Sequence, residues 1–170
     1  MWTPIEGFQH LSGEEIDALV EAPVLITILV GAADGEIDSE ERTWSERLLR
    51  SRTYNRPKEL NGYYRVVVEG FWAKVQDELA RLSEDKEVRN NVLSDRLAAL
   101  NPVLAKLDIE LAADLYKGYV DLAEEIAKSS GGFLRIGAIS PAEREWINLP
   151  MLKPIIFTKI ANEEDPGAED

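Results

Sequence analysis

The sequence lacks cysteine altogether and contains a single histidine, His10. Without cysteine the chain forms no disulfide, thiolate nucleophile, iron–sulfur cluster or sulfur-ligated zinc site. With one histidine it builds no cluster of imidazole ligands and has only one candidate base for a serine triad. His10 lies near Phe8 and Leu11 in the N-terminal leader, where we interpret it as a packing or surface residue rather than a catalytic one.

Positive charge is also scarce, with 19 lysines and arginines against 32 aspartates and glutamates, so that the formal net charge is -13 at pH 7. Nucleic acid and anionic membrane surfaces repel a chain of this charge. We therefore expect no nucleic-acid partner. Basic proteins or cations are the partners that this charge favours.

Long hydrophobic runs are missing as well. The longest apolar stretch covers residues 24–33, well short of the ~20 residues that span a bilayer. The N-terminus has no positive residue ahead of an apolar core, which a secretory signal would need. These absences predict no direct membrane insertion and a cytoplasmic location.

The length of 170 residues, with 45% hydrophobic and 30% charged residues, is typical of one globular domain. We expect a single helical domain over residues 1–162. Acidic residues then dominate, and residues 163–170 are predicted to be a disordered acidic tail.

Apolar residues recur at spacings of three and four, and the two-residue alternation of a half-buried strand is missing. This pattern predicts an all-α fold, a compact bundle of about seven helices. A short helix is expected after the capping box of Ser12 and Glu15, and a central helix over 24–33 is expected to open at Pro23. Further helices are expected over 38–52, 58–82, 88–100, 102–107 (with Asn101 as its N-cap), 111–126 and 141–148.

Several side chains are assigned to the core by this periodicity. Trp44, Leu48 and Leu49 are predicted to face inward, and Trp72 and Trp146 to lie in the core or between helices. Two glycines within helical patterns predict close helix crossings. The two glycines are Gly70 and Gly118. The residues predicted to face inward on the helix over 88–100 are Val88, Val92, Leu93 and Leu97. Near the C-terminus, the residues expected to pack on the bundle are Ile155, Ile156, Phe157 and Ile160.

Residues 35–44 and 137–146 form an internal repeat. Self-similarity of this kind predicts two pseudo-repeated helix–loop–helix units that lie face to face. The alternative is that both segments are simply well-capped helix starts, because S/T/D-x-x-E is common there. The matched pairs are Gly35 with Gly137, Ile37 with Ile139, Glu41 with Glu143, Arg42 with Arg144, and Trp44 with Trp146.

The first loop carries four carboxylates, Asp34, Glu36, Asp38 and Glu41, within eight positions around a glycine turn. Oxygen ligands of this kind suit calcium or magnesium, although the spacing is not that of an EF-hand. The loop therefore predicts a weak divalent-cation site, completed by an acid from another helix. Alternatively, Asp38 and Glu41 serve only as cap and box partner, and Asp34 only shapes the turn.

The stretch from Leu29 to Glu41, LVGAADGEIDSEE, resembles the signature of TerB-like proteins, a family named for tellurite resistance. It is also similar to the N-terminal domain of DjlA-type co-chaperones. The resemblance implies an all-helical bundle of two related units with a cation-binding acidic loop. The family motif corresponds here to Ala33, Asp34, Gly35, Asp38 and Glu41, with Glu143 in the second unit, where Ser130 and Ser140 replace the expected acids.

Together these features predict a non-catalytic helical interaction module of stress-response type that binds a divalent cation weakly and contacts another protein. Two alternatives stay open. One is a purely structural protein-interaction adaptor without metal. The other is a metal-dependent hydrolase that uses the same carboxylates to hold a metal-bound water.

Overall fold

The computed structural model describes residues 5–32, 37, 39–54, 57–129 and 144–158, without the side chain of Glu41. These residues form helices joined by short turns, with no strand among them, so the prediction of an all-α fold is confirmed. Among the described residues, six helices have at least eight residues, one fewer than the expected total of about seven, and α6 is a single turn. The elements are α1 (Gly13–Gly31), α2 (Ser39–Ser51), η1 (Lys58–Leu60), α3 (Asn61–Val68), α4 (Phe71–Arg81), α5 (Lys86–Ala98), α6 (Asn101–Leu104) and α7 (Ile109–Ser129).

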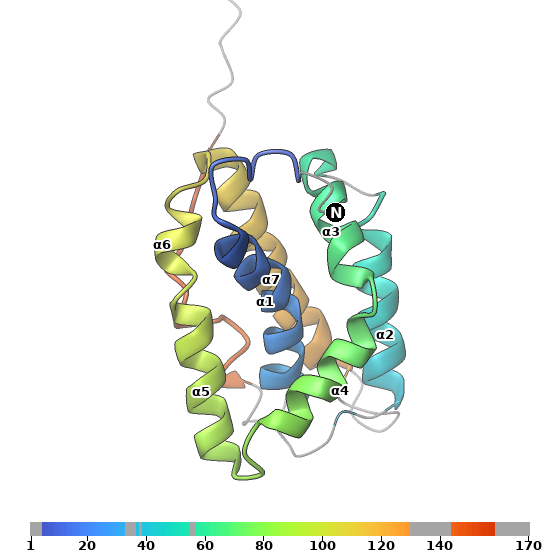
Figure 1. Ribbon diagram of the computed structural model, residues 1–170. Coiled ribbons are helices and arrows are strands. Elements are labelled where there is room, and N and C mark those ends of the chain that lie inside the picture. Colours follow the sequence, from blue (N-terminus) through green and yellow to red (C-terminus); the bar gives the residue numbers. More distant parts are fainter. Residues whose placement is uncertain (1–4, 33–36, 38, 55–56, 130–143, 159–170) are drawn as a thin grey trace, which may run out of the picture.

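Helix α1 is the central element of the bundle. It packs against α3, α4, α5 and α7, and Figure 1 shows it between α5 and α6 on one side and α2 and α3 on the other. Every residue from Val24 to Gly31 is buried, as the apolar run predicts. The helix begins at the predicted capping box, in which the amide of Glu15 donates to the Ser12 hydroxyl and the Ser12 amide donates to the Glu15 carboxylate.

The prediction that Pro23 opens a separate helix is wrong, because α1 runs through it without interruption. A proline inside a helix has no amide for the carbonyl four residues earlier, here that of Leu19. Two tyrosine hydroxyls take the place of that amide. Tyr63 of α3 donates to the Leu19 carbonyl oxygen at 2.5 Å and Tyr119 of α7 at 3.1 Å, and the two hydroxyl oxygens lie 2.9 Å apart. The substitute hydrogen bonds come from tertiary structure, which sequence periodicity does not register.

The single helix expected over 58–82 is also wrong. The chain breaks at Gly70, whose φ of +61° is a left-handed conformation that few residues other than glycine adopt. A Cβ at Gly70 would meet nothing within 4 Å, so this glycine serves a turn between α3 and α4 and not a helix crossing.

The predicted close crossing at Gly118 is confirmed. A Cβ there would lie 2.5 Å from the Tyr64 hydroxyl oxygen. Arg52 locks the crossing, because its guanidinium donates both to the Gly118 carbonyl oxygen at 2.9 Å and to the Tyr64 hydroxyl at 3.0 Å. Helices α2, α3 and α7 are thereby joined at one point.

The inward face of α2 differs from the expected one by one position. Ser45 and Leu49 are fully buried, whereas Trp44 is 42% exposed, so the prediction for Trp44 is wrong. Successive helical positions are about 100° apart, and the buried stripe follows Ser45 and Leu49 at i and i+4. Leu48 and Trp72 are partly buried against the core as predicted.

The prediction for α5 and the C-terminal segment holds only in part. Leu93 and Leu97 are buried and Ile155 and Trp146 pack on the core, but Val88, Val92, Ile156 and Phe157 are exposed. Asn101 is not an N-cap. Its side-chain amide donates to the Met151 carbonyl oxygen at 2.9 Å, and its carbonyl oxygen accepts the Lys153 amide at 2.8 Å, so it fastens the C-terminal segment to α6.

Residues 137–143, most of the second repeated segment, lie outside the described residues, as does Ile160. Arg144 is helical, residues 145–148 form a turn, and Leu149 after them is buried. The helices that precede the two repeated segments, α1 and α7, do pack against each other.

Candidate functional site

Four of the predicted metal ligands, Asp34, Glu36, Asp38 and Glu143, lie outside the described residues. The fifth, Glu41, lies in the first turns of α2, and its side chain is not described. The flanking elements are as predicted, since α1 ends at Gly31 and α2 begins at Ser39. The acidic loop thus connects two described helices.

A buried arginine marks the end of α1 beside this loop. The Arg89 guanidinium, on α5, donates to the Ala32 carbonyl oxygen at 2.9 Å and is only 7% exposed. Its Nε has no hydrogen-bond partner among the described residues. A cation at a helix C-terminus interacts favourably with the helix dipole and satisfies a carbonyl that the helix leaves unpaired.

His10 is exposed, and its ring nitrogen contacts the Lys106 carbonyl oxygen. It therefore packs on the turn after α6, in line with a surface or packing role. Across the part of the chain that the structure describes, no three histidines, aspartates or glutamates are grouped so as to hold a metal ion.

A groove of about 810 Å³ lies between α1, α3 and α4, and we call it the acidic groove. Its lining residues recur at i, i+3, i+4 and i+7 along α1 and again along α4, so one face of each helix forms a wall. The residues that line it are Glu14, Asp17, Ala18, Val20, Glu21, Val24, Val66, Glu69, Lys74, Asp77, Glu78 and Arg81.

The lining of the acidic groove includes four small apolar side chains, Ala18, Val20, Val24 and Val66. Val20 and Val24 are buried, and Ala18 and Val66 are partly exposed and pack on the core. Ala18 and Val66 therefore provide apolar contact area between the charged side chains. This combination of an apolar centre and a polar rim is the usual anatomy of a protein interface.

One arginine holds the two inner carboxylates of the acidic groove. Arg96 of α5 binds Glu21 at 2.7 Å and also pairs with Glu78, which is only 7% exposed. Burial works to lower the pKa of Arg96, but the hydrogen bonds to Glu78 and Glu21 outweigh it and raise that pKa. The bridge fixes α1, α4 and α5 together and compensates the buried charge of Glu78.

The outer carboxylates of the acidic groove stand apart from this bridge. Glu14 and Asp17 lie on α1, Glu69 follows α3, and Asp77 lies on α4, and all four are exposed. None of them forms an ion pair with another described residue. Even with Lys74 and Arg81 on its rim, the groove carries more negative than positive charge.

Sequence reasoning missed the acidic groove, although part of its signal is visible. Glu14, Asp17 and Glu21 share one helical face in the printed sequence, next to Ala18 and Val24. The other wall comes from α4, which the sequence alone merged with α3 into one helix. Without knowledge of the break at Gly70, the position of α4 relative to α1 could not be predicted.

A second hollow, of about 540 Å³, is lined by charged residues of both signs, among them Arg52, Lys58, Glu110 and Asp121. One of its lining residues, Pro57, directly follows residues 55–56 in the sequence, which lie outside the described part of the chain. Because residues of both signs line this hollow, it has no clear preference for a positive or a negative ligand, and no ligand class follows from it.

No family model, curated protein or solved structure matches this chain. Among the described helices, none has the length and apolar character that crossing a membrane requires.

Proposed function

We propose that this protein is a non-catalytic helical interaction module that binds a protein partner in the acidic groove. The observation that carries the proposal is the pairing of an apolar lining with four exposed carboxylates that form no ion pair within the described chain. The partly exposed side chains of Ala18 and Val66 gain contact area when a partner covers them, and the carboxylates select the partner by charge.

The groove's rigidity supports the same role. Its walls belong to helices tied together by the Arg96 bridge and by the core contacts of α1. A preformed surface loses little conformational freedom when a partner binds, so more of the contact energy appears as affinity.

The test is site-specific photo-crosslinking of the full chain in its native cells. A photoreactive residue replaces Glu69 in the groove or, as the control, Glu87, an exposed acid on α5. The expected result is a discrete partner crosslinked from Glu69 and not from Glu87. That partner, purified, then binds the wild-type chain about tenfold more tightly than the Ala18→Trp variant, in which an indole fills the groove.

Equal crosslinking from both positions, or unchanged affinity of Ala18→Trp for the purified partner, contradicts the proposal. Thermal unfolding of each variant shows whether the fold is retained.

Weak binding of Ca²⁺ or Mg²⁺ at the acidic loop is a second proposed property. It is supported by the four carboxylates of Asp34, Glu36, Asp38 and Glu41 and by the position of their segment between two helices, as the TerB-like resemblance implies. Two other positive charges compete with a cation for these carboxylates. They are the partial positive charge at the N-terminus of α2 and the Arg89 guanidinium beside Ala32. Both reduce the gain from a cation, which is why the proposed affinity is weak. Glu143 would complete the ligand set from the second repeat.

A further inference from the structure

We infer that the acidic groove accepts a basic amphipathic helix, about three turns long, from the partner. The inference rests on the proposed function and goes beyond it by naming the chemistry of the partner. Three properties of the groove support it: the charge of its lining, the secondary structure of its walls and its length.

Charge selects a cationic occupant. The groove is lined by six carboxylates and by two cations, and Arg96 compensates two of the carboxylates from α5. The four outer carboxylates stand on both walls, with Glu14 and Asp17 on α1 and Glu69 and Asp77 opposite. Lysine or arginine on both flanks of the occupant therefore finds a counter-charge, whereas an acidic occupant is repelled.

The walls select a helix over a strand. Extended peptides bind either by adding themselves to the open edge of a sheet or, when they are rich in proline, in a groove lined by aromatic residues. The acidic groove is bounded by α1, α3 and α4, and its lining provides neither a strand edge nor an aromatic residue. The backbone of the wall helices is already hydrogen-bonded internally, so the occupant has to satisfy its own amides and carbonyls over the apolar part of the groove. A helix does this.

The length of the groove sets the length of the occupant. On α1 the lining residues run from Glu14 to Val24, which is about 15 Å at 1.5 Å per residue. A partner helix of about ten residues, or three turns, lies along such a wall. Its apolar stripe lies against Ala18 and Val66, the two partly exposed apolar side chains of the groove.

The experiment titrates three designed peptides of about 14 residues into the isotopically labelled full chain. The first is a lysine-rich amphipathic helix with a leucine and alanine stripe, the second has the same composition in scrambled order, and the third replaces each lysine by glutamate. Amide chemical shifts locate binding, and calorimetry gives the affinity.

The expected result is saturable binding of the first peptide, with shifts concentrated at Ala18, Val24 and Val66 and an affinity that weakens as salt rises. The scrambled and acidic peptides bind at least about tenfold more weakly. The groove variant Asp17→Asn/Glu69→Gln/Asp77→Asn loses about tenfold in affinity for the first peptide. The control variant Glu84→Gln/Glu87→Gln/Asp95→Asn, which removes the same charge from exposed positions on and before α5, keeps it.

Equal binding of the ordered and scrambled peptides, or equal losses in the two variants, overturns the inference and shows general attraction to an acidic protein only. Absence of binding overturns it as well. If the crosslinked partner nevertheless occupies the groove, the interaction function stands and only the basic helix is wrong.

Discussion

The carbonyl oxygen of Leu19 accepts the hydroxyl of Tyr63, because the residue one turn later, Pro23, has no amide to offer it. The Tyr119 hydroxyl reaches the same oxygen, so three helices meet at one buried acceptor. Each hydroxyl has one proton, and the pair satisfies the acceptor whichever of them donates.

We predict that Tyr63→Phe and Tyr119→Phe are cooperative. Either variant leaves one hydroxyl on the Leu19 carbonyl and costs about 1 kcal/mol of unfolding free energy, whereas the double variant strands a buried acceptor and costs about 3 kcal/mol or more. Urea unfolding measures this. In a Pro23→Ala background, the amide of residue 23 can donate to the Leu19 carbonyl oxygen, so the extra cost of the double variant should be smaller. Strictly additive effects of the two tyrosine substitutions in both backgrounds would contradict this explanation.

Stability should fall at high pH. Burial raises the pKa of Tyr63 and Tyr119 above the ordinary value of a tyrosine. The native protein therefore keeps these protons after the unfolded chain has released them. The stabilisation is complete below about pH 10 and is lost above it, with a slope approaching 1.4 kcal/mol per pH unit for each tyrosine.

Urea unfolding between about pH 9 and 11.5 measures that slope. Tyr119→Phe should remove the contribution of one tyrosine to the slope of unfolding free energy against pH. Tyr54→Phe is the matched control, because Tyr54 is 71% exposed. An unchanged slope in Tyr119→Phe would show that the buried hydroxyl is not the cause.

Two glycine substitutions should have opposite signs. Gly118→Ala places a methyl group 2.5 Å from the Tyr64 hydroxyl oxygen and should destabilise the protein by about 1–3 kcal/mol. Gly62→Ala, in α3, meets nothing within 4 Å and should stabilise it by about 0.4–1 kcal/mol by restricting the unfolded chain. Thermal unfolding of the two variants side by side tests the crossing of α3 and α7. Equal effects would mean that no close crossing exists there.

Calcium titration tests the acidic loop. We expect saturable amide shifts near Asp34 with a dissociation constant of about 10⁻⁴–10⁻³ M, as for weak oxygen-ligand sites. Asp34→Asn should abolish them, while Glu87→Gln, which removes one exposed carboxylate from α5, should not. Shifts that never saturate, or that persist in Asp34→Asn, would leave the loop as a pair of helix caps.

The periodicity of apolar residues was sufficient to predict the helical class, because it depends on local geometry that every amphipathic helix shares. It also located α5, α7 and the buried run of α1. It failed at Pro23 and Gly70 for opposite reasons. Pro23 is tolerated because of hydroxyls on distant helices, and Gly70 breaks a pattern that continues through it.

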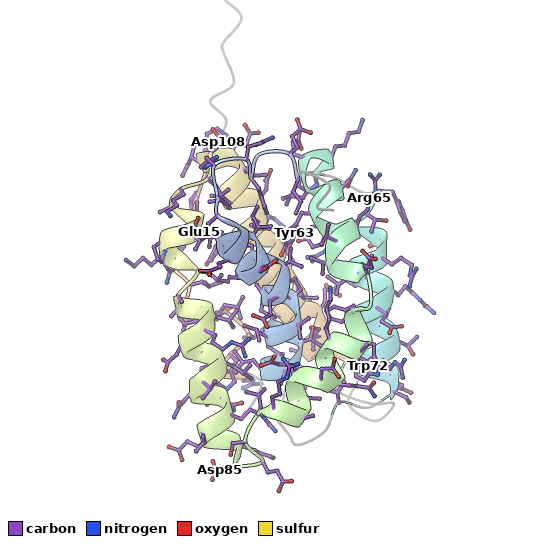
Figure 2. All side chains as sticks on the ribbon, viewed as in Figure 1. Glu15, Tyr63, Arg65, Trp72, Asp85 and Asp108 are labelled. Carbon is purple, nitrogen blue, oxygen red and sulfur yellow. The ribbon has the colours of Figure 1, made fainter. Side chains whose placement is uncertain are left out.

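The acidic groove could not be predicted from the sequence, because it depends on the angle between two helices. Asp17 and Asp77 are separated by 60 residues and share one groove only because of the turn at Gly70. Trp44 shows the same limit on a smaller scale. A shift of one position rotates a side chain by about 100°, enough to move it from the core to the surface. Figure 2 shows Tyr63 between α3 and α1. Its hydroxyl donates to the Leu19 carbonyl oxygen and so joins these two helices.

Nuclear Overhauser effects between the lysine-rich helical peptide and the methyl groups of Ala18 and Val66, the two partly exposed apolar residues of the acidic groove, test the proposed binding mode most directly. We expect contacts from both residues to the leucine stripe of the peptide and none from the exposed methyl groups of Val88 on α5. Contacts to Val88 in place of Ala18 and Val66 would contradict the binding of this helix in the groove.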